Sequence, residues 1–364
     1  MRQRRFILDS AVGKTGFCSG RLFSAGYLSV VLLVTLVCGC ASHEPRTLKV
    51  DSAETIAVFP FENFSDDEQA LSMVIPALTG LLKMKGVNLA VEEDLDRLLI
   101  AERVRYSGYV PRGLAGKMRS ELNVAAVLTG AVVSFSSEGN PRVGVLARLI
   151  DTADGRIRWA GFASATGDDF ATVLGLGRIT TMDALLPRVL DMLLSSFTTE
   201  PPLKEKESTY TIAVLPFLNR AEQRGAGMIA SYLFVTELVN DPLFIPFEFG
   251  DVRKTIVDLR VRSRGEIDFA TLSSLAEALN VDLVLVGTVE VYPKDMSPSV
   301  PPEAAISSRL LNVREKKIVW AGSSQLNGDE SITAFEWGKV RSPEGVAAIA
   351  VSRLTERMHK ATWQ

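Results

Sequence analysis

The stretch Thr55-Ile-Ala-Val-Phe-Pro-Phe61-Glu-Asn63 decides the fold class, because the chain contains it twice. It returns as Thr211-Ile-Ala-Val-Leu-Pro-Phe217-Leu-Asn219. The apolar run of β-forming residues predicts a buried strand. Pro60 predicts that this strand ends there or lies at a sheet edge, because proline cannot donate to a β-ladder. We expect the asparagine after each strand to hold an Asx-type turn, with a ligand contact as the alternative.

Three further blocks recur in the same order, at offsets of 157 to 161 residues. They are Asp94 with Arg103-Val104-Arg105 and Asp251 with Arg260-Val261-Arg262; Leu122-Asn123-Val124 with Gly130 and Leu279-Asn280-Val281 with Gly287; and Arg148-Leu149 with Ile157 to Gly161 and Arg309-Leu310 with Ile318 to Gly322. Four collinear blocks indicate two copies of one domain. We place the copies at residues 55–198 and 210–362, joined by a proline-rich, charged linker at 199–209.

Each half reads as an α/β sandwich with a mixed sheet, because early strand–helix units give way to a hairpin. Ser65 to Glu68 predicts a capping box, and Asn123 predicts a helix end in the left-handed conformation. Gly130 predicts a bulge or a close backbone approach. Ala153-Asp154-Gly155 predicts a tight primed turn between two antiparallel strands. A closing helix is expected in each half.

The amino-terminal segment predicts the location of the protein. Basic residues precede an apolar run from Leu28 to Val37, which has the length of a signal-peptide core. The following Leu36-Val37-Cys38-Gly39-Cys40 resembles the lipobox of bacterial lipoproteins. That resemblance implies a signal peptide at 1–39, acylation of Cys40 with chains such as palmitate, and a tether at 40–54. An uncleaved signal anchor or an ordinary secretory signal is the alternative.

Composition excludes several function classes. The chain has 364 residues with a formal net charge of −3, and removing the basic first 39 residues leaves a charge near −7. A negative protein of this kind is a poor match to nucleic acid. All three cysteines lie in the first 40 residues, so the folded part has no disulfide framework. The chain has two histidines, His43 and His359, which leaves no zinc site and no metal or other cofactor to expect.

Several motifs together resemble the CsgG-like superfamily of curli-secretion lipoproteins, which includes the amino-terminal domain of TolB. They are the "IAV-hydrophobic-PF-x-N" opening, the "DLxRLL" helix, the "LNV-x-x-VLTG" strand and the "RLID-x-x-x-GRI-x-W" hairpin. The resemblance covers both halves and implies a periplasmic-facing lipoprotein that binds other proteins or forms rings. It implies no enzymatic activity. The segment 135–143 is too short for the membrane-spanning hairpins of the curli channel.

Candidate chemistry elsewhere is sparse. Gly225-Ala-Gly227-Met-Ile-Ala230 fits the G-x-G-x-x-A pattern of dinucleotide sites, but it does not directly follow a strand. Carboxylates such as Asp66, Glu92 and Asp94 cluster at expected helix starts, where the helix dipole favours negative charge. We therefore expect no catalytic residues, and nucleotide or small-ligand binding stays a minor alternative.

Repeated arginines and tryptophans are the candidate partner-binding residues. They are Arg103, Arg105, Arg260, Arg262, Trp159 and Trp320. The arginines would contact an acidic partner or cover a solvated helix face. The tryptophans would lie at an interface or pack beneath a neighbouring helix. The sequence thus predicts a non-enzymatic lipoprotein at the periplasmic face of the outer membrane, acting on envelope proteins, with an oligomeric ring in a secretion complex as the alternative.

Overall fold

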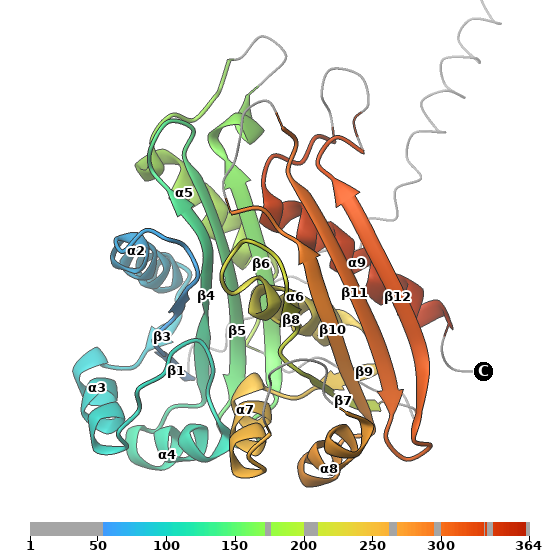
Figure 1. The fold of residues 1–364 in the computed structure, drawn as a ribbon. Helices are drawn as coiled ribbons and strands as arrows, with labels where there is room; N and C mark the ends of the chain where they lie inside the picture. Colours follow the sequence, from blue (N-terminus) through green and yellow to red (C-terminus); the bar gives the residue numbers. More distant parts are fainter. Residues whose placement is uncertain are drawn as a thin grey trace, which may run out of the picture. The chain divides into compact units, whose positions relative to one another are not determined.

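The repeated strand lies inside each of two six-stranded mixed sheets (Figure 1). The computed structural model describes residues 54–171, 176–199, 210–261, 268–294, 300–330, 332 and 338–361. These all belong to one compact unit, residues 46–364. The predicted signal peptide lies outside the described residues, as do the tether and linker except for Glu54 and Thr199.

The first sheet, sheet A, has the order β3-β1-β4-β5-β6, with β2 also pairing with β4. Pairs among β1, β2, β3 and β4 are parallel, and β4-β5-β6 is antiparallel. The strands are β1 (Thr55–Val58), β2 (Glu62–Asn63), β3 (Asn88–Leu89), β4 (Ala126–Ser136), β5 (Arg142–Asp151) and β6 (Ile157–Thr166).

The second sheet, sheet B, repeats this plan with the order β9-β7-β10-β11-β12, and β8 pairs with β10. Its strands are β7 (Tyr210–Val214), β8 (Leu218–Asn219), β9 (Phe244–Pro246), β10 (Leu283–Val291), β11 (Glu303–Asn312) and β12 (Lys317–Asn327). The prediction of two copies of a mixed-sheet α/β fold is confirmed.

Each half contributes four α-helices among its described residues. Those of the first half are α2 (Ala70–Met84), α3 (Glu92–Ala101), α4 (Arg112–Leu122) and α5 (Met182–Leu193), with short 3-10 turns η1 (Gly167–Phe170) and η2 (Leu194–Ser196). Those of the second half are α6 (Ala226–Asn240), α7 (Phe249–Asp258), α8 (Phe269–Leu279) and α9 (Pro343–Ala361). No helix in the described ranges is long and apolar enough to cross a membrane.

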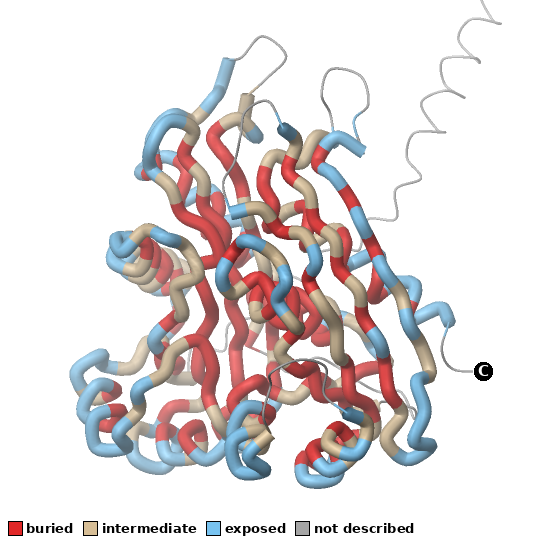
Figure 2. The backbone as a smooth tube through the Cα atoms, in the orientation of Figure 1, coloured by how far each residue is buried: buried red, intermediate tan, exposed pale blue. Residues whose placement is uncertain are grey.

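The two halves pack with the helix layer of the second half against the sheet of the first half. Helices α2 and α5 cover one face of sheet A, and helices α6 and α9 contact both the other face of sheet A and the inner face of sheet B. These elements give the layer order helix, sheet, helix, sheet, and α3, α4, α7 and α8 contact the sheets together at one end of the molecule (Figure 1). The strands β4 to β6 are buried along almost their whole length, whereas β10 to β12 alternate between buried and exposed residues (Figure 2).

Several local predictions are confirmed. Strand β1 stops at Val58, before Pro60. Asn123 and Asn280 end their helices with φ of 53° and 54°, in the left-handed region. Gly130 marks a close approach, because a Cβ there would lie 2.0 Å from the carbonyl oxygen of Leu146 and 2.8 Å from the Phe61 ring. Gly287 meets Phe217 in the same way at 2.2 Å.

The predicted capping box is wrong. Helix α2 begins at Ala70, and its N-cap residue, Gln69, makes no side-chain cap. Ser65 lies in a turn before the helix, where its backbone N–H donates to Asn63 Oδ1 at 3.0 Å. Asn219 holds the equivalent turn by accepting from the Ala221 N–H at 3.0 Å. The asparagine at the strand end orders this segment, as expected, and removes the need for a serine cap.

The predicted tight turn is also wrong. The loop between β5 and β6 covers residues 152–156, and Gly155 is the residue there with positive φ, at 74°. A two-residue primed turn of type I′ needs positive φ at both central residues. A longer loop with one left-handed glycine forms instead, closed by the Gly155 N–H donating to the Asp151 carbonyl at 3.0 Å.

Candidate functional site

The two repeated tryptophans both pack against the core, Trp159 fully and Trp320 partly. Trp159 is 4% exposed and meets the Phe197 ring edge-on at 5.0 Å between centroids. Its ring lies over Gly161, where a Cβ would be 2.5 Å away, and the half-buried Trp320 lies over Gly322 in the same way at 2.6 Å. Trp159 is therefore packed in the core, whereas Trp320 keeps part of its surface exposed, and an interface role for the tryptophans stays a prediction.

Three of the repeated arginines, Arg103, Arg105 and Arg260, are exposed but do not lie on a helix face. Arg103 and Arg260 follow the last residues of α3 and α7, each with φ of 54°. The Arg103 N–H donates to the Ile100 carbonyl, and the Arg260 N–H to the Val257 carbonyl, at 3.1 and 3.0 Å. Glycine is the usual residue at this position of a helix end. Arg105 is exposed just beyond, whereas Arg262 and Cys40 lie outside the described residues.

A buried ion pair joins the two halves. Arg148 of β5 and Glu248, which precedes α7, are each 1% exposed, and Arg148 Nε donates to Glu248 Oε2 at 3.2 Å. The guanidinium carbon lies 4.2 Å from the centre of the Tyr232 ring on α6. Burial is the largest single influence on the pKa of Arg148 and lowers it, but the charges and hydrogen bonds of Glu248 and Tyr232 together raise the pKa overall, so the guanidinium stays charged.

Carboxylates of the second half also bind backbone of the first. Glu248 Oε1 accepts from the Val110 N–H at 3.2 Å, and Asp251 Oδ1 accepts from the Arg112 N–H at 2.9 Å. Arg112 is the first residue of α4, whose own N-cap, Pro111, has no side-chain acceptor. The second half therefore caps a helix of the first.

A second buried carboxylate, Glu344 in the first turn of α9, reaches Ser134 Oγ on β4. The loop before α6 also takes part in the contact between the two halves. A Cβ on Gly225 would lie 2.4 Å from the Phe64 ring of the first half, and Gln223 Nε2 donates to the Phe64 carbonyl at 2.9 Å. The first glycine of the G-x-G-x-x-A stretch, Gly225, thus lies under an aromatic ring of the first half, whereas a Cβ on Gly227 would lie 2.1 Å from the Phe217 carbonyl oxygen of its own half.

Arg148 and Arg309 recur in the sequence, but no local motif around them predicts a role. The available signal was the contrast between β5 and β11. Between Val143 and Ile150, β5 is apolar on both faces except for Arg148, whereas β11 carries Ser307 and Arg309 at alternate positions. A strand that is apolar on both faces is covered on both sides. This contrast points to a covered face in the first half and an open face in the second.

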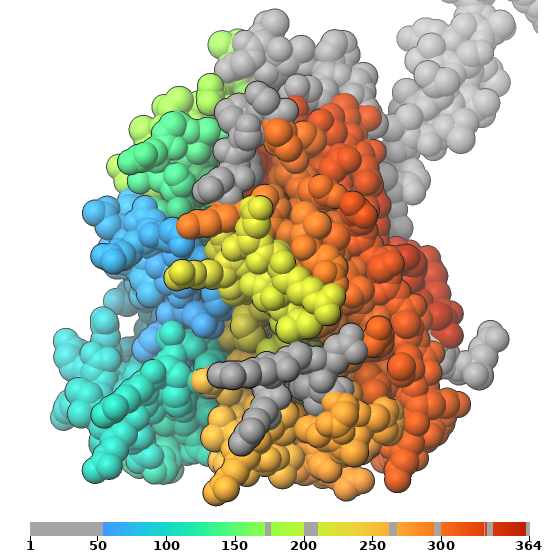
Figure 3. All heavy atoms as spheres, in the orientation of Figure 1, coloured from blue at the N-terminus to red at the C-terminus, as the bar shows by residue number. Residues whose placement is uncertain are grey.

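Among the described residues, part of the face of sheet B and the edge at β12 stay uncovered, although α7 and α8 also contact this sheet. Thr288 and Ser307 are half-buried, and Arg309, Ala321 and Ser323 are exposed on the face of sheet B opposite α6 and α9. Strand β12 pairs with β11 on one side and has no strand on its other side among the described residues. Figure 3 shows these orange strands forming a broad surface on the front of the molecule.

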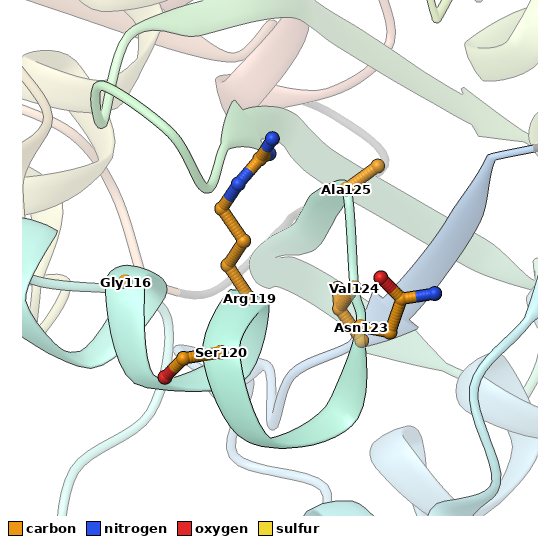
Figure 4. A pocket seen from close by; sticks show the side chains of 6 residues that line it. All are labelled: Gly116, Arg119, Ser120, Asn123, Val124 and Ala125. Atoms are coloured by element: carbon orange, nitrogen blue, oxygen red, sulfur yellow. The ribbon is translucent and has the colours of Figure 1, made fainter.

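A pocket of about 400 Å³ lies at the end of α4. Gly116, Arg119, Ser120, Asn123, Val124 and Ala125 line it. Figure 4 shows Arg119 extending from α4 and the carboxamide of Asn123 at the helix end. Arg119, Ser120 and Asn123 are exposed, so this is a surface hollow with no buried polar group aimed into it. The described residues hold no cluster of three metal-ligating side chains.

No protein-family model and no curated protein matches the chain. Among solved structures it is similar to the PelC dodecamer from Paraburkholderia phytofirmans, at 15% identity and a TM-score of 0.30 over 43% of this chain and 90% of that one. It is similar to lipoprotein GNA1162 from Neisseria meningitidis at 17% identity and a TM-score of 0.28, over 42% of this chain and 98% of that one. It is also similar to TolB from Acinetobacter baumannii at 12% identity and a TM-score of 0.24, over 44% of this chain and 29% of that one. The CsgG-like resemblance stays a prediction.

Proposed function

We propose that this protein is a lipid-anchored, non-enzymatic interaction module of the bacterial envelope, held by Cys40 at the periplasmic face of the outer membrane. It binds another envelope protein through the open edge of β12. The anchor rests on the Leu36-to-Cys40 sequence, and the binding mode rests on the state of this edge.

The observation that carries the proposal is the length and composition of β12. The strand runs for 11 residues, and from Ile318 to Asn327 it has no charged residue and no proline. Natural sheets protect exposed edges with charges, prolines or short strands, and an unprotected edge accepts another strand. The equivalent strand of the first half, β6, is instead buried against the second half.

One main-chain group of this edge already accepts a donor from outside the ladder. Arg357 Nη2 on α9 donates to the Ser323 carbonyl at 2.7 Å, so Ser323 points its main-chain groups away from β11. An incoming strand would pair with such groups, with affinity from the backbone and specificity from alternate side chains. The exposed side chain of Ile318, 53% accessible, would add an apolar contact near the start of the strand.

A proline at the edge tests this mode of binding. Ser323→Pro removes an outward N–H and spares the ladder with β11, whereas Ser323→Ala keeps the N–H and removes only the hydroxyl. We expect a protein that co-purifies from detergent-solubilised membranes with the unmodified chain and with Ser323→Ala, and that is lost with Ser323→Pro. Equal recovery with all three chains would show that β12 is not the binding edge.

Replacing the lipidated cysteine tests the anchor separately. We expect Cys40→Ser to abolish incorporation of an alkyne-labelled fatty acid and to move the protein from the outer-membrane fraction to the soluble periplasmic fraction. The Cys38→Ser chain is the matched control and should keep both label and location. Unchanged fractionation of Cys40→Ser would refute the lipid anchor while leaving the edge proposal intact.

A further inference from the structure

The same face of the sheet is covered in the first half of the chain and uncovered in the second, among the described residues. We call it the outer face of each sheet. On sheet A it consists of Ala131, Leu146, Arg148, Ala160 and Phe162, and the second half covers it. The repeat places Thr288, Ser307, Arg309, Ala321 and Ser323 at the corresponding positions of sheet B, and these are half-buried or exposed.

The helix that fills the first surface has an uncovered counterpart. Helix α6 is buried on nearly all sides, as a helix apolar on all faces should be. Its counterpart α2 has no charged residue from Ala70 to Leu82, yet Pro76, which takes the place of Tyr232, is exposed. Met84 at the end of α2 is 79% exposed, and Val91 beyond it is 57% exposed.

Charges on the two uncovered surfaces are complementary. Arg309 takes the place of the buried Arg148 and is exposed on the outer face of sheet B. Val91 takes the place of Glu248 as the residue before its helix, and it is followed directly by two exposed carboxylates, Glu92 and Glu93. The surface formed by α2 and the start of α3 therefore carries carboxylates next to the position that corresponds to Glu248, the partner of Arg148. These carboxylates could pair with Arg309 of another chain.

We propose that α2 of one chain docks on the outer face of sheet B of a second copy, repeating between chains the contact that joins the halves. The two surfaces differ, so the association is head-to-tail and produces rings or filaments rather than a two-fold dimer. Sheet B has Ser307 and Ser323 where sheet A has Leu146 and Phe162, so the contact buries less apolar surface and is reversible. It does not depend on the lipid anchor or on the edge of β12.

Directional cross-linking tests the proposal in a chain that starts at residue 41 and so contains no cysteine. Pro76→Cys marks α2, and Ala321→Cys marks the outer face of sheet B. With a short bismaleimide reagent at high protein concentration, we expect a ladder of oligomers when one chain carries both cysteines. An equimolar mixture of the two single-cysteine chains should stop at dimers, and each single-cysteine chain alone should remain monomeric.

Charge variants of the doubly marked chain separate docking from random collision. Arg309→Glu should lose the ladder and Arg309→Lys should keep it, while circular dichroism stays unchanged because Arg309 is exposed. Sedimentation velocity of the cysteine-free chain should show the same dependence on residue 309. A ladder that is absent, insensitive to Arg309→Glu, or matched by cross-linking of Pro76→Cys to itself would overturn the proposal.

Discussion

Arg148 and Arg309 occupy equivalent places in the two halves but have opposite surroundings. Arg148 is 1% exposed and paired with Glu248, whereas Arg309 is exposed on an open sheet face. Removing one partner of a buried pair leaves an uncompensated buried charge, which costs about 3–5 kcal/mol. Exposed substitutions away from such features usually change stability by less than about 0.5 kcal/mol. The repeat thus supplies its own control.

We predict that Arg148→Met lowers the free energy of unfolding by about 3–5 kcal/mol, whereas Arg309→Met changes it by less than about 0.5 kcal/mol. Urea unfolding of the chain from residue 41, followed by tryptophan fluorescence, measures both. Adding Glu248→Leu to Arg148→Met should recover only part of the loss, because the Val110 N–H then loses its acceptor. Similar losses for the two arginine variants would contradict this account.

Glu62 makes the contact between halves sensitive to pH. Burial raises the pKa of its carboxyl above the usual 4.5, although the hydrogen bond from Tyr232 and the charge of Arg148 act in the opposite direction. The folded state therefore takes up a proton at a pH where the unfolded chain is still ionised. The contribution of Glu62 to folding stability therefore grows as the pH falls from neutral through the pKa of Glu62 in the folded protein. It stops growing once the same carboxyl in the unfolded chain is protonated as well.

We predict that Glu62→Gln removes this pH-dependent contribution. The stability difference between the unmodified chain and Glu62→Gln should shift in favour of the unmodified chain as pH falls from 7 toward 4.5. Guanidinium unfolding at a series of pH values measures the difference directly. A constant difference over this interval would show that Glu62 has the same proton affinity in both states.

At the scale of elements, the ends of α3 and α7 carry an arginine in a conformation that glycine adopts more easily. Arg103 and Arg260 each have φ of 54°. The left-handed conformation costs a residue with a Cβ roughly 1–2 kcal/mol, and the greater freedom of unfolded glycine offsets part of the gain. We predict that Arg103→Gly and Arg260→Gly each stabilise the protein by about 0.5–1 kcal/mol.

Thermal unfolding measures this gain, and the co-purification assay gives the reason for retaining arginine. If a partner protein binds these arginine side chains, the glycine variants will be more stable, but less of the partner will co-purify with them. Arg103→Lys keeps the charge and the backbone strain, so it should leave stability unchanged. A loss of stability in Arg103→Gly would mean that the guanidinium holds part of the fold.

The pairing of phenylalanine with glycine across the sheet is a second feature of this scale. A Cβ on Gly287 would lie 2.2 Å from the Phe217 ring and 2.4 Å from the Ser307 carbonyl oxygen. We predict that Gly287→Ala costs about 1–3 kcal/mol through overpacking. Gly80→Ala on α2, where a Cβ meets nothing within 4 Å, should instead stabilise by about 0.5–1 kcal/mol. Urea unfolding of the two variants would contradict this if both changed in the same direction.

The sequence predicted these elements well because their signals are local. Apolar runs of β-forming residues placed the strands, and the repeated asparagines placed the helix ends at Asn123 and Asn280. The capping box at Ser65 failed because Asn63, two residues earlier, orders the same backbone. The contact between the halves could not be predicted in this way. The Arg148–Glu248 pair spans 100 residues, and no local pattern specifies such a partner.

At the scale of the whole molecule, the two halves fold as one unit because each leaves apolar surface that the other covers. The outer face of sheet A and the outward side of α6 belong to one hydrophobic core. We predict that a chain cut within residues 200–209 yields fragments that purify together. Co-expression with an affinity tag on one fragment measures this. Fragments that are separately soluble and do not bind each other would contradict it.

The order in which the two halves stack is a fixed property of this protein. The first half ends the stack with helices, and the second half ends it with a sheet whose outer positions are serine, threonine and arginine. A molecule that stacked the halves in the reverse order would bring Ser307 and Ser323 into the interior and turn Leu146 and Phe162 toward water. The two copies, although descended from one pattern, can therefore no longer trade places.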